Sequence, residues 1–259
     1  MKQCLPRHRR GCTSPDRHLL SKCRLKFIHI TKCAGKALED WGKLHGFAWG
    51  RLCKRIKIAT RKGLKHPQTG RMKCEPWHVP PRFFRENPYD DFDVFAVVRN
   101  PYDRAISEFR CPWKGFEAPA STCIEKHARR VAATSKQLNE WLQRKLKSGV
   151  ARPPFKNGHF IPQHLYLFDG SGHRFVPPQM VLRFECLRAE FEGLLQQYGL
   201  AVSPLKRCNE SQVPRFGIQD LTEETRRLVE EEYADDFKLL GYPMMAPRVC
   251  GSEGNHKEC

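Results

Sequence analysis

Two cationic turns, each directly after a short apolar run, are the features of this chain whose residue types and spacing suggest chemistry. The first lies in KFIHITKCAGKALEDW, residues 26–41, where Lys32 stands between a strand pattern and a helical pattern. The second lies in VVRNPYDRAIS, residues 97–107, where Arg99 follows the apolar run and Ser107 comes eight residues later. Backbone N–H groups at a helix start, lysine and arginine all favour an anion. Both turns therefore predict contact with a phosphate-bearing ligand.

The first turn does not match the phosphate-binding loop of nucleotide kinases. That loop requires GxxxxGK[ST], whose last hydroxyl binds magnesium, whereas this chain offers only Gly35-Lys36-Ala37. A magnesium-dependent kinase is therefore the weaker option. Taken alone, the first window also fits an ordinary strand-to-helix connection on a basic surface, and Arg99 also fits a surface arginine at a strand end.

The charge balance of the 259-residue chain is strongly basic. There are 46 Lys and Arg against 28 Asp and Glu, a formal charge of +18 at pH 7. Such a surface attracts nucleic acid, acidic lipid, sulfated glycan or phosphorylated nucleotide. Part of the excess lies in residues 1–24, which we expect to form a basic N-terminal arm, and a second dense block spans residues 51–73. The absence of a nucleic-acid-binding motif with interleaved aromatic residues counts against nucleic acid.

Cysteine content and hydropathy give expectations about the cellular compartment and membrane association of the protein. Twelve cysteines without a CxxC pair disfavour a zinc ribbon or a thioredoxin-like site and suit an oxidising compartment. No apolar run approaches the roughly 18 residues that span a bilayer, and residues 1–25 lack the apolar core of a signal peptide. The chain as given is therefore expected to be soluble, with membrane association only through an anchor that it does not contain.

Apolar runs and helical periodicity alternate along the middle of the chain. The run VFAVV at 94–98 is typical of a parallel strand covered on both faces, and Pro101 behind it fits the first turn of a helix. Further strands are predicted at 27–30 and 180–184, and further helices at 34–45, 135–148, 187–198 and 222–241. This order predicts one α/β domain over residues 25–243, a parallel β-sheet flanked by helices, with an unstructured tail at 244–259. The ligand should lie beyond the carboxyl ends of the strands.

Both cationic motifs resemble cofactor-binding segments of a known enzyme family. FIHITKCAGKALE is similar to the 5′-phosphosulfate loop, and FAVVRNPYDRAISEF closely resembles the 3′-phosphate motif, of the sulfotransferases that use 3′-phosphoadenosine 5′-phosphosulfate (PAPS). HFIPQHLYLFD, VLRFECLRAEFEGLL and LVEEEYADDFKLLGY resemble, in the same order, segments of the Golgi-type carbohydrate sulfotransferases, which include the heparan sulfate 2-O- and 6-O-enzymes. The resemblance covers roughly residues 25–243. It implies a P-loop-like α/β fold, no metal, an anionic or neutral glycan acceptor and a place in the Golgi lumen or membrane.

The resemblance also assigns roles to residues of the two turns. It implies that Lys32 supports the 5′-phosphosulfate and the departing bridging oxygen, and that Gly35 is the loop glycine. Arg99 and Ser107 match the pair that holds the 3′-phosphate. The loop departs from the usual Lys-Thr-Gly-Gly-Thr-Ser at four cofactor-binding positions, which are Cys33, Ala34, Lys36 and Ala37. Two hydroxyl donors are thereby lost, and Lys36 is the candidate replacement cation.

Sulfuryl transfer also needs a base for the acceptor hydroxyl, a role that suits a histidine titrating near neutral pH. His78 in CEPWHVPPRFF is the preferred candidate, because it lies between the two motifs, where the heparan sulfate 2-O- and 6-O-enzymes place a catalytic histidine. His29 and His159 are rival bases, and for His29 a place in the core is the commoner fate. Three further residues are candidates for contact with the nucleotide or the acceptor: Arg183, Gln163 and Asn209. A structural role fits each of them equally well.

Two functions are open at this point. The preferred one is an enzyme that transfers the sulfuryl group of PAPS to a hydroxyl, with a carbohydrate as the favoured acceptor and a tyrosine or a smaller alcohol as others. The alternative is a non-catalytic protein on a degraded sulfotransferase fold that binds polyanions, either heparin-like glycan or nucleic acid. Basic residues at 51–73 and 129–147 serve both functions, because a positive field gathers anionic chains.

Overall fold

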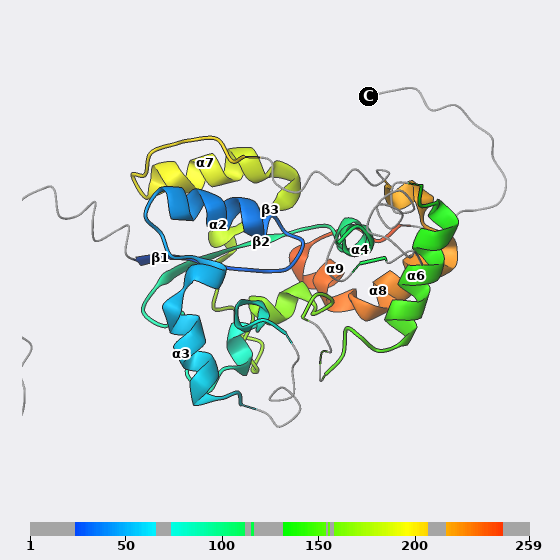
Figure 1. The fold of residues 1–259 in the computed structure, drawn as a ribbon, viewed down its shortest axis with the longest axis horizontal. Coiled ribbons are helices and arrows are strands. Elements are labelled where there is room, and N and C mark those ends of the chain that lie inside the picture. The colour runs from blue at the N-terminus through cyan, green and yellow to red at the C-terminus, as the bar shows by residue number, and fades with distance from the viewer. Residues whose placement is uncertain are drawn as a thin grey trace, which may run out of the picture.

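A parallel sheet lies at the centre of the fold, and in the described part of the chain it has three strands (Figure 1). Strand β1 (Leu25–Ile28) pairs with β2 (Asp93–Val98), and β2 pairs with β3 (Val181–Arg183). Every side chain from Val94 to Val98 is buried, as expected for an apolar strand covered on both faces. The predicted α/β fold, a parallel sheet flanked by helices, is confirmed.

The structure is a computed structural model that describes residues 24–65, 74–111, 115–116, 132–153, 155, 158–206 and 216–245. The α-helices within these ranges are α2 (Gly35–Leu44), α3 (Lys54–Lys62), α4 (Pro101–Phe109), α6 (Ser135–Lys147), α7 (Leu187–Gln197), α8 (Glu223–Glu232) and α9 (Ala234–Leu240). Short 3₁₀ turns are η1 (Gly50–Leu52), η3 (Pro76–His78), η4 (Pro81–Phe83), η5 (Gln163–Tyr166), η6 (Pro178–Met180), η7 (Phe184–Cys186) and η8 (Ile218–Asp220). None of the helices described is both long and apolar enough to cross a lipid bilayer.

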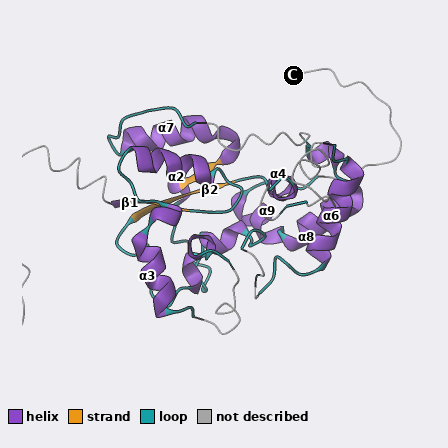
Figure 2. Ribbon diagram, viewed as in Figure 1, coloured by secondary structure: helices purple, strands orange, loops and turns teal. Residues whose placement is uncertain are grey.

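The helices form layers around the sheet (Figures 1 and 2). Helices α2 and α7 lie together on one side, where the ring of Trp41 meets that of Phe191 edge-on at 5.1 Å. The Phe95 ring of β2 packs beneath them against Trp49, with ring centres 5.1 Å apart. Helix α3 lies on the opposite side of the sheet from α2, and α6 packs with α4 and α8 at one end of the molecule. The site residues are therefore held by a core that joins three strands to helices on both faces.

Two elements differ from the sequence-based expectation. The helix expected over 222–241 is interrupted at Tyr233, whose φ of −119° separates α8 from α9. The Tyr233 hydroxyl donates to the carbonyl of Phe160, 3.1 Å away, so the interruption is tied to the core. The proline-rich stretch after residue 74, where no helix was predicted, forms η3 and η4. Proline suits the start of such turns, since its fixed φ is already helical and its missing N–H needs no partner.

The buried carboxylate of Asp236 joins α9 to η5. It accepts hydrogen bonds from the backbone N–H groups of Gln163 and His164, each at 2.8 Å, and it lies 2.7 Å from Nδ1 of His164. Asp236 therefore fixes the position of Gln163, which is fully buried behind the second cationic turn.

We expect Asp236→Ala to lower the free energy of unfolding by about 3 kcal/mol, because two buried N–H donors would lose their acceptor. Asp235→Ala is the matched control: it lies in the same first turn of α9, and its side chain is 66% exposed. The control should change stability by no more than about 0.5 kcal/mol. Urea denaturation followed by circular dichroism measures both, and equal losses in the two variants would contradict the role given to Asp236.

Candidate active site

The two cationic turns meet at the carboxyl ends of β1 and β2. These strands are adjacent and parallel, with Ile28 beside Ala96, so the chain leaves both at the same edge of the sheet. There, Nη1 of Arg99 donates a hydrogen bond to the carbonyl oxygen of Lys32 at 3.3 Å. Two segments separated by 67 residues thus form one surface, as a ligand that bridges them requires.

The first turn has an unusual backbone. Lys32 and Ala34 both lie in the left-handed region, with φ of 63° and 60°. This conformation costs an L-residue about 1–2 kcal/mol and is the one in which glycine is preferred. Ala34 is also the N-cap of α2, and no side chain caps it or places an acid in the first helical turn. The first N–H groups of α2 are therefore available to an anion.

The side chains of this turn point in different directions. Cys33 is buried, and its thiol donates to the Gln163 amide oxygen at 3.4 Å. Burial is the main cause that raises the pKa of this thiol to about 12, so it stays protonated. Lys36, the candidate replacement cation, pairs with Asp40 one turn along α2 at 2.5 Å. Cys33 can therefore face a ligand only through its backbone N–H, and the charge of Lys36 is shared with a carboxylate.

Steric contact explains why a glycine stands at position 35. A Cβ atom placed on it would lie 2.2 Å from Nε2 of His29, far inside van der Waals contact. The His29 ring is held in this place because its Nδ1 lies 2.7 Å from the buried Glu39 carboxylate. Glu39 also accepts from the backbone N–H of Arg51 at 2.9 Å. His29 is thus a support beneath the turn, which matches the core role weighed for it.

The second turn is held by its backbone, which leaves the Arg99 guanidinium for other contacts. The Gln163 amide accepts from the N–H of Arg99 at 2.9 Å and donates to its carbonyl at 2.8 Å. The guanidinium lies over the Phe184 ring, 4.1 Å from its centre. Its Nε–H is buried and has no acceptor among the residues described. Ser107, the other predicted phosphate ligand, lies partly buried in the last part of α4.

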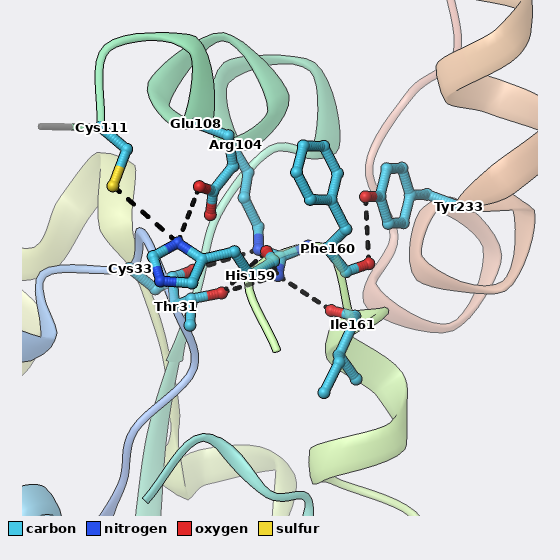
Figure 3. Close-up of polar contacts among 9 residues, drawn as sticks. All are labelled: Thr31, Cys33, Arg104, Glu108, Cys111, His159, Phe160, Ile161 and Tyr233. Atoms are coloured by element: carbon cyan, nitrogen blue, oxygen red, sulfur yellow. Dashed lines mark hydrogen bonds and ion pairs between the residues drawn. The ribbon is translucent and has the colours of Figure 1, made fainter. Parts of the chain in front are cut away.

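A buried arginine ties the first turn to the chain that carries His159. Nη2 of Arg104 donates to the carbonyls of His159 at 3.0 Å and Ile161 at 2.8 Å (Figure 3). The same guanidinium contacts Thr31 through its carbonyl at 3.1 Å and its hydroxyl at 3.0 Å. Sequence reasoning did not single out Arg104, although it lies within the NPYDRAIS motif. One arginine therefore fixes both the turn before Lys32 and the loop that presents His159.

Three histidine rings cluster beside the first turn. The ring centre of His78 is 4.9 Å from that of His29 and 5.4 Å from that of His159, both in edge-on contact. The backbone of His78 is held by Tyr166, whose hydroxyl donates to its carbonyl at 2.7 Å. All three histidines considered as bases therefore lie in one place, reached from three separate segments of the chain.

The surroundings shift the pKa values of two of these histidines in opposite directions. Burial, together with the neighbouring rings of His29 and His159, lowers the pKa of His78 well below 6.5. Burial also acts to lower the pKa of His159, but hydrogen bonds to Cys111 and Glu108 outweigh it and raise this pKa to about 9. Glu108 Oε2 lies 2.9 Å from Nδ1 of His159. At neutral pH, His78 can accept a proton, whereas His159 already holds one.

Of the further candidates, two are structural in this arrangement. Gln163 holds the Arg99 backbone, as described, and Arg183 donates to the carbonyl of Leu240 at 2.6 Å while lying 4.6 Å from the Tyr242 ring centre. Asn209 lies outside the described residues. The same holds for part of each basic block expected to gather an anionic chain.

Comparison with known proteins adds one finding. The model of the sulfotransferase family matches residues 19–243, most of the chain. The chain belongs to the sulfotransferase family. No curated protein and no solved structure matches it. The match establishes the family, whose activity is sulfuryl transfer, and it leaves open the heparan sulfate type that the motifs resemble.

In this sulfotransferase, we expect Ala34→Gly to stabilise the fold by up to about 1 kcal/mol. Glycine removes the strain of the left-handed conformation at this position, partly offset by the greater freedom of the unfolded chain. Ala37→Gly is the matched control, because it lies inside α2, where glycine costs up to about 1 kcal/mol. The melting temperature and the urea midpoint should therefore rise in Ala34→Gly and fall in Ala37→Gly. Destabilisation by both would show that the turn is not strained.

Proposed function

We propose that the chain is a PAPS-dependent sulfotransferase that transfers the sulfuryl group to a carbohydrate hydroxyl and releases adenosine 3′,5′-bisphosphate. The observation that carries the proposal is the contact of Arg99 with the carbonyl of Lys32. It joins the two turns that carry Arg99 and Lys32 at one edge of a parallel sheet, where ligands of such sheets bind. A nucleotide with phosphate groups at both its 3′ and 5′ positions suits two cationic turns held this way. Family membership supports the same chemistry.

The two turns would divide the nucleotide between them. Lys32 and the N–H groups from Cys33 to Ala37 suit the 5′-phosphosulfate, because they combine a cation with the start of α2. Arg99 suits the 3′-phosphate, because its buried Nε–H lacks an acceptor among the described residues and a guanidinium binds phosphate through paired donors. Ser107 would add a hydroxyl. Because the Cys33 side chain points inward, the backbone N–H groups and Lys32 would supply the hydrogen bonds that the two missing hydroxyls cannot donate.

His78 is the group that we assign to the acceptor hydroxyl. As a new S–O bond forms to the acceptor oxygen, the S–O bond to the bridging oxygen of the donor breaks, and the hydroxyl proton passes to the imidazole of His78. Positive charge from Lys32 stabilises the negative charge that grows on the departing oxygen. The low pKa of His78 keeps its ring neutral and able to take the proton. The positive His159 beside it adds to the cationic field at the reacting groups.

An anionic glycan suits the surface next to His78. Helix α3 packs against η3, the turn that carries His78. The exposed face of α3 presents Lys54, Lys57 and Arg61 at helical spacing, beside the exposed Ile58. A positive helix packed against the turn that carries the base raises the local concentration of an anionic acceptor. This placement supports a uronate- or sulfate-bearing chain over a neutral alcohol.

Calorimetry with adenosine 3′,5′-bisphosphate tests the donor site. We expect the native chain to bind it, and Lys32→Ala and Arg99→Ala each to weaken binding by on the order of tenfold to a hundredfold, because each removes a charge-assisted hydrogen bond. Lys136→Ala, on an exposed side chain of α6, is the control and should bind as the native chain does. Absence of measurable binding in the native chain would falsify the assignment.

A transfer assay with labelled PAPS tests the acceptor class in the same preparation. We expect label to enter a heparin-precursor glycan in preference to a tyrosine peptide or a small alcohol. Arg99→Ala should abolish the transfer. Strongly salt-dependent heparin binding that needs no nucleotide, with no label transferred, would point instead to the non-catalytic polyanion binder.

The pH profile of transfer identifies the base. With His78 as the base, kcat/KM should be constant around neutral pH and fall only in acid, well below pH 6.5, where His78 becomes protonated. His78→Gln should lower kcat by about 10²–10⁴. His173→Gln, on a 77% exposed side chain, should have no effect. If kcat/KM instead rises up to about pH 9, and Glu108→Gln moves that rise to lower pH, His159 is the base.

A further inference from the structure

Three side chains that can bind a metal converge at the end of α4 (Figure 3). Nδ1 of His159 lies 2.9 Å from a carboxylate oxygen of Glu108 and 4.0 Å from Sγ of Cys111. The ligand atoms of all three residues lie within 4.8 Å of one another. Figure 3 shows Glu108 and Cys111 reaching the same ring nitrogen from two points on one segment. An imidazole, a thiol and a carboxylate therefore face a common point.

The local fold holds this arrangement from both sides. Glu108 lies in the last turn of α4 and Cys111 just beyond it, and the N–H of Cys111 donates to the carbonyl of Glu108 at 2.9 Å. Their spacing of three residues places both side chains on one side of the chain. His159 is fixed through its carbonyl, which accepts from Arg104 at 3.0 Å and from the Thr31 hydroxyl at 3.0 Å. Such outer contacts are what orient the ligands of metal sites.

The carboxylate of Glu108 carries a second, independent sign of a bound cation. Glu108 is only 1% exposed, and its Oε1 atom has no hydrogen-bond donor among the described residues. A buried carboxylate oxygen without a donor is costly. A metal ion bound through Oε1, or through both carboxylate oxygens, would satisfy it.

We propose that Glu108, Cys111 and His159 form a zinc site. Nitrogen, oxygen and sulfur donors together select zinc over magnesium or calcium, which take oxygen alone. Tetrahedral zinc, with bonds of about 2.0–2.3 Å, sets neighbouring ligand atoms roughly 3.3–3.7 Å apart. Because the present separations are at most 4.8 Å, shifts of no more than about 1.5 Å reach this arrangement. On binding, the Cys111 thiol and the His159 ring release their protons to solvent, and the fourth position takes a water molecule.

The metal site adjoins the proposed acceptor base. His159 touches His78 edge-on, with ring centres 5.4 Å apart. Because two protons leave as one divalent ion binds, the net charge of the site stays the same. Binding of the metal does not depend on the function proposed above.

Cobalt(II) in place of zinc gives a test independent of activity. The full native chain, freed of metal under reducing conditions, should develop the near-ultraviolet thiolate-to-cobalt charge-transfer band and the visible bands of a four-coordinate ion. Zinc should displace them. Cys111→Ser should lose the charge-transfer band, and Glu108→Gln should weaken cobalt affinity at least about tenfold. The matched control Cys186→Ser, on an exposed cysteine, should behave as the native chain does.

The outcomes separate the zinc site from an ordinary ion pair. Absence of the band in the native chain, or an equal band in Cys111→Ser, would overturn the proposal. Circular dichroism of each variant shows whether it is folded, and Glu108→Gln provides a second test if Cys111→Ser is not.

Discussion

The candidate active-site edge of this sulfotransferase depends on one buried guanidinium, that of Arg104. It is 2% exposed and makes four hydrogen bonds, two to Thr31 and one each to the carbonyls of His159 and Ile161. Burying a charge is costly unless all of its donors are paired, so the groups around it are strongly constrained. The turn that contains Lys32 and the segment that carries His159 are therefore fixed relative to each other by one side chain of α4.

A neutral amide plays the corresponding part for the second turn. Gln163 pairs with both backbone groups of Arg99 and accepts from Cys33, and it is held in turn by Asp236. The Arg99 backbone thus needs nothing from its own side chain. The guanidinium keeps an N–H without an acceptor among the described residues, which a globular protein seldom leaves in place without a use. Gln163 positions the turn, so the Arg99 guanidinium stays available to a ligand.

The sequence predicted the elements whose signal is local. The continuous run of β2 and Pro101 at the start of α4 are readable from a few residues, and parallel strands necessarily bring the two turns to one edge. The link between Glu108 and His159 is different, because it joins residues 51 apart in sequence. In the sequence of an amphipathic helix, a glutamate that is buried in the fold cannot be distinguished from one that is exposed to solvent. The inward turn of Cys33 and the interruption at Tyr233 likewise depend on partners from distant segments, Gln163 and Phe160.

The departures of the first turn from the family pattern are explained by these supports. Where the family usually has threonine, Cys33 packs inward on Gln163, so its thiol joins the two turns. Where the family usually has glycine, Ala34 accepts a left-handed backbone that Arg104, His29 and Gly35 hold from below. A turn fixed by so many buried contacts presents its N–H groups in one arrangement before any ligand arrives. In the proposed donor site, preorganised backbone donors would then offset the loss of side-chain hydroxyls, because they have no ordering cost on binding.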